Sequence, residues 1–224
     1  MIIRCTLLFT FLLASLAAQT LEATLARMDQ AAAGFRGISA QLDQVSHTAI
    51  IDDTMTESGT IVLYRPRPRD LRMLVEFTKP DARAVSYANR KVQIFYPKAN
   101  TVQEYDLGKQ SALVDQFLLL GFGTPGSELR KAYEVRHTGR ETIDGTPCDR
   151  LELVPRDAEA LKHVRRIEIW ISESTGQPVR QKIHQPSRDY REIRYSGLKL
   201  NPPLSEDSVR LKLPRGVKRT RPQK

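Results

Sequence analysis

The sequence has few of the residues that build disulfide frameworks, metal sites or cofactor sites. Among its 224 residues are two Cys and one Trp, and aromatic residues make up 7%. Cys5 lies in a segment that we expect to be removed, so Cys148 has no partner for an internal disulfide. The four histidines lack the spacing of metal ligands. The composition therefore excludes a disulfide-stapled scaffold, and we expect neither a metal nor a cofactor.

Catalytic and nucleotide-binding motifs are also missing. The chain contains no G-x-S-x-G elbow, no phosphate-binding loop and no dinucleotide fingerprint, and Gly121-Phe122-Gly123 lacks the continuation that such loops require. Asp52 and Asp53 stand among Thr and Glu residues, which favours a solvated hairpin loop over an acid–base pair. We therefore expect a protein that is not an enzyme.

A long apolar run occurs at the N-terminus, where it has the layout of an export signal. Arg4 precedes an apolar stretch from Cys5 to Ala14, and small residues allow cleavage after Ala17. An uncleaved anchor is the alternative, but the stretch is short for a bilayer span of about 20 residues. We expect a signal peptide at residues 1–17, a single domain at 18–217 and a basic, frayed tail at 218–224.

Positive charge exceeds negative charge along the chain. Lys and Arg total 35 and Asp and Glu 26, which gives a formal net charge of +9. The Arg residues are spread over several strands and loops, and no basic strip interleaved with aromatic residues occurs, so nucleic acid is not expected as a partner. Anionic lipid headgroups or an acidic protein surface suit an exported basic protein better.

The hydrophobic pattern changes from helical to strand-like near Ile38. Leu21 to Phe35 has one apolar face at helical spacing, and Ser111 to Gly121 predicts a short, very apolar helix bordered by glycines. Alternating runs predict antiparallel strands elsewhere. The expected strands are 39–46, 59–65, 71–77, 83–88, 91–96, 101–107, 132–140, 148–154, 164–172, 178–184, 190–195 and 209–213. Asp157 to Lys162 is consistent with a helical turn or a solvated loop.

The alternation gives the sheet one apolar face and one charged face. A large antiparallel sheet tends to curl, and an apolar concave side must be filled by side chains or hold a ligand. Both predicted helices could complete the core, whereas the glycines around the second helix favour a mobile cover. We predict that an apolar cavity is lined by Leu71, Met73, Val75, Phe77, Val92, Ile94, Tyr96, Phe117 and Leu118.

Several short motifs follow one another along the chain. They are Gly59 to Pro66, ending in Arg-Pro, an apolar strand ending in Thr78-Lys79-Pro80-Asp81, and the Asn89 to Pro97 hairpin. Their order resembles the LolA family of periplasmic lipoprotein carriers, and Leu213 to Val217 is similar to the closing P-x-G-V of that family. The resemblance covers the chain from about Leu21 to Val217, although Arg67-Pro68 looks like an insertion relative to the family pattern.

The resemblance implies a fold and a function. The fold is mainly β with α: a strongly curved antiparallel sheet, or incomplete β-barrel, with an N-terminal helix and a helical lid over an apolar cavity. The implied function is that of a monomeric periplasmic carrier that takes acylated lipoproteins from an inner-membrane releasing transporter to an outer-membrane receptor. Arg65 matches the family arginine that holds the lid closed. The alternative is a periplasmic lipid-sensing or regulatory binding protein of the same fold.

Overall fold

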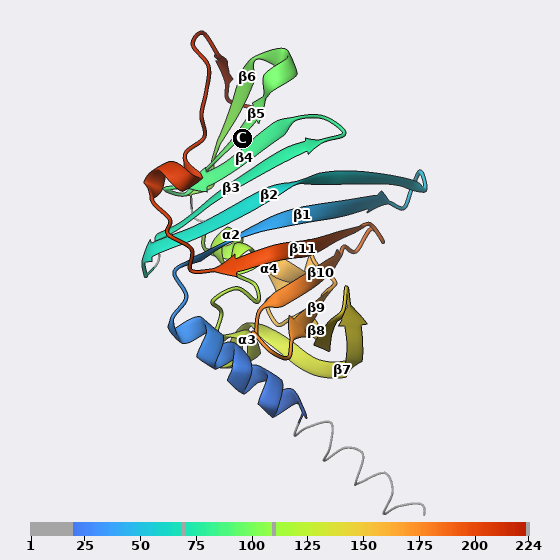
Figure 1. Cartoon of the computed structure of the whole chain (residues 1–224). Helices are drawn as coiled ribbons and strands as arrows, with labels where there is room; N and C mark the ends of the chain where they lie inside the picture. Colours follow the sequence, from blue (N-terminus) through green and yellow to red (C-terminus); the bar gives the residue numbers. More distant parts are fainter. Residues whose placement is uncertain (1–19, 69, 109–110, 223–224) are drawn as a thin grey trace, which may run out of the picture. The chain divides into compact units, whose positions relative to one another are not determined.

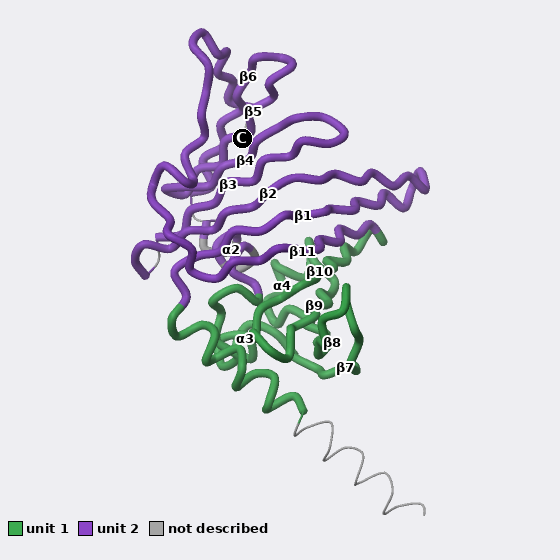
Figure 2. Tube along the Cα trace, in the orientation of Figure 1, with its two compact units in different colours: residues 1–34, 121–188 green, residues 35–120, 189–224 purple. Residues whose placement is uncertain are grey.

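The computed structural model describes residues 20–68, 70–108 and 111–222. The predicted signal peptide lies outside these residues. The described chain is mainly β with short helices, as predicted. It divides into two compact units (Figure 2). Unit 1 comprises residues 1–34 and 121–188, and unit 2 comprises residues 35–120 and 189–224.

Unit 2 is built on an open sheet with the strand order β12-β6-β5-β4-β3-β2-β1-β11 (Figure 1). Its strands are β1 (Gly37–Thr48), β2 (Asp53–Arg67), β3 (Asp70–Lys79), β4 (Arg83–Ala88), β5 (Lys91–Tyr96), β6 (Thr101–Asp106), β11 (Tyr190–Leu200) and β12 (Lys218–Thr220). Its helices are α2 (Ser111–Leu118) and the 3-10 turns η1 (Pro97–Ala99) and η3 (Glu206–Val209). Neighbouring strands from β11 to β6 pair antiparallel, as the alternation predicted.

The C-terminal segment of unit 2 differs from the prediction. We predicted a strand at Val209–Leu213, but η3 ends at Val209 and the following residues form no strand. Leu211 and Leu213 pack with Val217 against a cluster of buried residues in β4, β5 and β6. Leu211 and Leu213 therefore alternate because their side chains pack on the sheet, although their backbone forms no strand hydrogen bonds. A period of two in the sequence does not distinguish such an extended segment from a paired strand. Lys218–Thr220, expected to fray, form β12 parallel to β6.

Unit 1 contains four antiparallel strands in the order β10-β9-β8-β7. They are β7 (Tyr133–Ile143), β8 (Thr146–Pro155), β9 (Arg166–Ser172) and β10 (Pro178–His184), accompanied by a helix over residues 20–33, α3 (Gly126–Ala132) and α4 (Ala158–Leu161). Asp144 and Gly145 join β7 to β8 with φ values of 47° and 79°, the left-handed conformations of a two-residue hairpin turn. Helix α4 shows that Asp157 to Lys162, for which a helical turn and a solvated loop were both left open, forms a helical turn. Helix α3 was not predicted.

A buried carboxylate ties the helix over residues 20–33 to the strands of unit 1. Asp149 is fully buried and accepts hydrogen bonds from Thr24 Oγ1 at 2.8 Å and from Arg27. The ring of His137 lies 2.9 Å away, and Arg140 Nε donates at 3.2 Å. Burial opposes ionisation, but the hydrogen bonds from His137 and Thr24 and the charge of Arg27 outweigh it and lower the pKa of Asp149.

No helix in the described residues is long and apolar enough to span a membrane. The same part of the chain contains no group of three or more His, Cys, Asp or Glu side chains placed to hold a metal ion. Cys148 is a buried free thiol, and burial raises its pKa.

Candidate functional site

One face of the unit 2 sheet carries the apolar side chains predicted to line a cavity. The strand register places Leu63, Met73, Tyr87 and Val92 in one row across β2 to β5. The next row contains Ile61, Val75, Val85 and Ile94. We call these two rows, with Leu71, Phe77 and Tyr96 on the same face, the apolar face.

Exposure increases across the apolar face from β3 towards β5. Leu71, Met73, Val75 and Phe77 of β3 are all buried. Val92, Ile94 and Tyr96 of β5 are half-buried, as are Val85 of β4 and Tyr105 of β6. The β5 end of the face therefore leaves apolar surface accessible to a ligand, whereas the β3 part is already covered.

Helix α2 is tied to the apolar face by a hydrogen bond. The hydroxyl of Tyr87 on β4 donates to Asp115 Oδ1 at 2.7 Å. Burial, followed by the hydrogen bond to Asp115, raises the pKa of Tyr87, so the hydroxyl stays protonated and remains a donor. Asp115 stands in a segment that is otherwise very apolar. The bond fixes helix α2 against β4 at a polar point.

Arg65 lies on the same strand face as Ile61 and Leu63. Its Nη2 donates to the carbonyl oxygen of Phe35 at 2.9 Å, and its guanidinium carbon lies 4.9 Å from the centroid of the Phe35 ring. Burial lowers the pKa of Arg65. Arg65, which the resemblance associates with the lid, is thus half-buried beside the Phe35 ring. Its hydrogen bond to the Phe35 carbonyl fixes the backbone just before β1.

The apolar face ends in a polar cluster. Glu57 is buried and accepts from Arg83 Nη2 and from Gln44 Nε2, both at 3.0 Å. The guanidinium of Arg83 also stacks over the Phe77 ring, 4.2 Å from its centroid. Phe77, predicted to line the cavity, therefore has one ring face covered by a cation.

A cavity of about 250 Å³ opens beside the Tyr87–Asp115 hydrogen bond. It is lined by Asp70, Leu71, Tyr87, Asn89, Arg90 and Asp115. Asp70 pairs with Arg72 Nε at 2.9 Å, which contributes to lowering its pKa. The cavity joins a polar rim to two residues of the apolar face, an arrangement that fits a ligand with a polar end and an apolar body.

The structure brings the strand residues of the prediction together on one face. Leu118 of α2 is half-buried, while the side chain of Phe117 lies outside the described residues. Sequence reasoning missed the contact between Tyr87 and Asp115. A signal was present, because a single carboxylate in an apolar helix requires a partner when the helix packs on a sheet.

The model of the MucB/RseB N-terminal domain family matches residues 75–212. The match covers β4 to β11 and the second half of β3, and it is longer than half of the chain. The chain belongs to the MucB/RseB N-terminal domain family. Among curated proteins, none matches this member of the family.

Solved structures share the fold of this MucB/RseB-family chain at low sequence identity. MucB is 16% identical with a TM-score of 0.54, and the match covers 87% of this chain and 63% of MucB. An uncharacterised conserved protein from Thermus thermophilus is 13% identical with a TM-score of 0.56. The match covers 92% of this chain and 99% of that protein. LprF from Mycobacterium bovis is 12% identical with a TM-score of 0.50. The match covers 84% of this chain and 98% of LprF. With the family match, these likenesses confirm the predicted LolA-like fold family.

Proposed function

We propose that this protein binds acyl chains on the apolar face of unit 2 and carries lipoproteins through the periplasm from the inner to the outer membrane. The observation that supports this proposal is the half-exposed apolar surface of β5 next to β4, which Tyr87 links to helix α2 by a hydrogen bond. A surface of this kind suits binding, and we propose no catalytic step. The ligand would contact the predicted residues of β3, β5 and α2.

The energetics of an acyl chain explain why such a surface would be useful. Burying one CH₂ group is worth about 0.8 kcal/mol, so a chain of about 16 carbons represents about 12 kcal/mol. A free lipid anchor would not cross an aqueous compartment at that cost. A carrier must recover most of this free energy and still release the chain, so a cover that competes with the ligand for the apolar face lowers net affinity.

The remaining parts of the proposal come from the resemblance to the LolA family. We propose an inner-membrane releasing transporter as donor, an outer-membrane receptor as acceptor, and a monomeric carrier. Arg65 would stabilise the closed position of the lid, with Tyr87 and Asp115 as a second contact that the structure provides.

A second candidate is a lipid-sensing or regulatory binding protein of the same fold. It is favoured by the family match, which is to the MucB/RseB N-terminal domain rather than to a lipoprotein carrier. The chain spans 63% of the length of MucB, so the activities and partners of that whole protein are proposals for this one.

Mass spectrometry of the protein purified from its native host distinguishes the two candidates. We expect lipid extraction to release an acylated protein or lipid in stoichiometric amount. An empty protein that copurifies with one stable protein partner would favour the sensing candidate, and an empty protein without a partner would contradict both.

Ile94→Glu locates the binding surface. Ile94 is half-buried on the apolar face, so a carboxylate there is tolerated by the fold but opposes an acyl chain. We expect affinity for a fluorescent fatty acid to fall about tenfold or more, given that burying a side chain of this size is worth about 1.5–3 kcal/mol. Thr78→Glu adds the same charge at an exposed position of β3 and serves as the control. Equal affinities would place the ligand elsewhere.

A further inference from the structure

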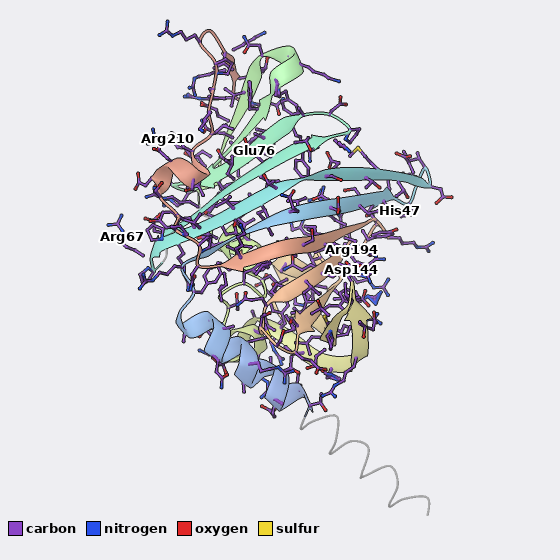
Figure 3. All side chains as sticks on the ribbon, in the orientation of Figure 1. His47, Arg67, Glu76, Asp144, Arg194 and Arg210 are labelled. Carbon is purple, nitrogen blue, oxygen red and sulfur yellow. The ribbon has the colours of Figure 1, made fainter. Side chains whose placement is uncertain are left out.

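The C-terminal segment of unit 2 carries a concentration of positive charge that the proposed binding face does not use. From Arg210 to Lys224 the chain has seven Lys or Arg residues and no Asp or Glu. We call the described part of this segment, residues 210–222, the basic strip. Arg210 is labelled at its start in Figure 3.

Packing directs the charges of the basic strip outward. Leu211, Leu213 and Val217 contact a buried cluster formed by Ala84, Phe95 and Val102, which lie on the face of β4 to β6 opposite the apolar face. The basic residues that alternate with them are exposed: Arg210, Lys212, Arg215, Lys218, Arg219 and Arg221. The strip is therefore amphipathic, with its apolar side already occupied by the sheet.

The basic strip is held in place by the backbone. Lys218 N donates to Asn100 O at 3.0 Å, and Asn100 Nδ2 donates to Gly216 O at 3.3 Å. Lys218–Thr220 then pair with β6. Because the segment is already ordered, docking on a surface costs less conformational entropy than ordering a free tail would.

The charge of the strip is only partly neutralised. Arg219 and Arg221 share Glu104, and Arg210 pairs with exposed Asp207 at 3.0 Å. In the described part of the chain, the side chains of Lys212, Arg215 and Lys218 form no ion pair.

We propose that the basic strip docks the protein on a lipid bilayer that contains anionic headgroups. Clusters of four to eight Lys or Arg residues beside a membrane segment or on an amphipathic helix bind anionic lipids, and the basic strip carries a cluster of that size on an ordered segment. The strip has no aromatic side chain on which a nucleic-acid base could stack. The proposal does not depend on the apolar face, because the strip and its supporting cluster occupy the other side of the sheet strands.

Vesicle cosedimentation tests the proposal. We expect the purified protein to bind vesicles of phosphatidylcholine and phosphatidylglycerol at about 50 mM salt, to bind pure phosphatidylcholine vesicles weakly, and to dissociate at about 300 mM salt because the charges are screened. Combined Lys212→Gln, Arg215→Gln and Lys218→Gln substitutions should weaken binding at least tenfold, since each basic residue contributes about a fivefold change near an anionic surface.

A second triple variant controls for net charge. Lys79→Gln, Lys91→Gln and Lys199→Gln remove the same charge from exposed positions of unit 2 outside the strip, and should change binding less than about twofold. Circular dichroism verifies that both variants fold. Equal losses in the two variants, or no binding of the unmodified protein to anionic vesicles, would overturn the proposal. So would strip-dependent binding of polyglutamate or duplex DNA without vesicle binding, which would assign the strip to an acidic protein or to nucleic acid.

Discussion

Single polar residues determine how the apolar parts of this protein are held. Asp149 in unit 1 and Asp115 in unit 2 are carboxylates whose partners lie far away in sequence, and each connects a helix to a strand within its unit. Such contacts contribute little net energy while intact, but they are costly to break, because a buried polar group then loses its partner.

Asp149→Asn tests this dependence and its link to pH. Asn keeps one acceptor oxygen, but it has no charge and places an NH₂ group where Asp149 had its second acceptor for Thr24, Arg27 or His137. We expect the free energy of unfolding to fall by about 2 kcal/mol at pH 7, below the 3–5 kcal/mol of a fully buried pair because Arg27 is partly exposed. The lowered pKa means that the stabilisation is present above the ordinary carboxyl pKa of about 4 and is lost as pH falls through the lower value of the folded protein.

Urea unfolding at pH 7 and at about pH 2.5 measures the effect, and the difference between the original protein and Asp149→Asn should shrink in acid. Glu134→Gln, which removes an exposed carboxylate paired with Arg136, should have little effect at either pH. If the difference in unfolding free energy between the two proteins were the same at both pH values, the stabilisation would come from the packing of the side chain and not from its charge.

Elements bounded by turn residues were predictable from the sequence, and contacts between distant elements were not. β4, β5 and β10 match their predicted ends, because Pro and Asn residues stop the alternation on either side. The alternation also gave the correct faces for Val75 and Ile94. It could not show that Leu211 and Leu213 pack on the sheet without strand hydrogen bonds, nor that Tyr87 forms a hydrogen bond with Asp115. Periodicity specifies which face of an element a residue occupies, but not which residues pack against that face.

Tyr87→Phe tests whether α2 is a movable cover. The variant keeps the ring and loses the hydrogen bond to a charged acceptor, worth about 1.5 kcal/mol or more, so amide exchange in α2 should become about tenfold faster. Tyr105→Phe is the control, since its hydroxyl donates to Gln103 on its own strand. Unchanged exchange in the Tyr87 variant would show that α2 is held by its apolar contacts alone.

Arg65→Leu belongs to the same test, because the resemblance implies that Arg65 also holds the closed position. We expect this variant to stay folded and to release a bound fatty acid more slowly, since the closed cover competes less with the ligand. Unfolding of Arg65→Leu would instead assign the residue to support of Phe35 and the start of β1.

At the scale of the whole molecule, the proposed function requires export. The signal predicted at residues 1–17 gives a mature chain that starts at Ala18. Intact mass of the protein from the periplasmic fraction should correspond to residues 18–224. A mass that includes residues 1–17 would support the anchored alternative, and recovery from the cytosol would contradict export.

The short parallel strand β12 has a consequence for solubility. It occupies the outer edge of β6, whose backbone donors and acceptors would otherwise be open to strands of other molecules. Lys218–Thr220 pair with Thr101–Gln103 and so shorten the open edge of β6. We expect that trimming by a protease after Val217 would uncover the whole edge and make fibrous aggregation easier.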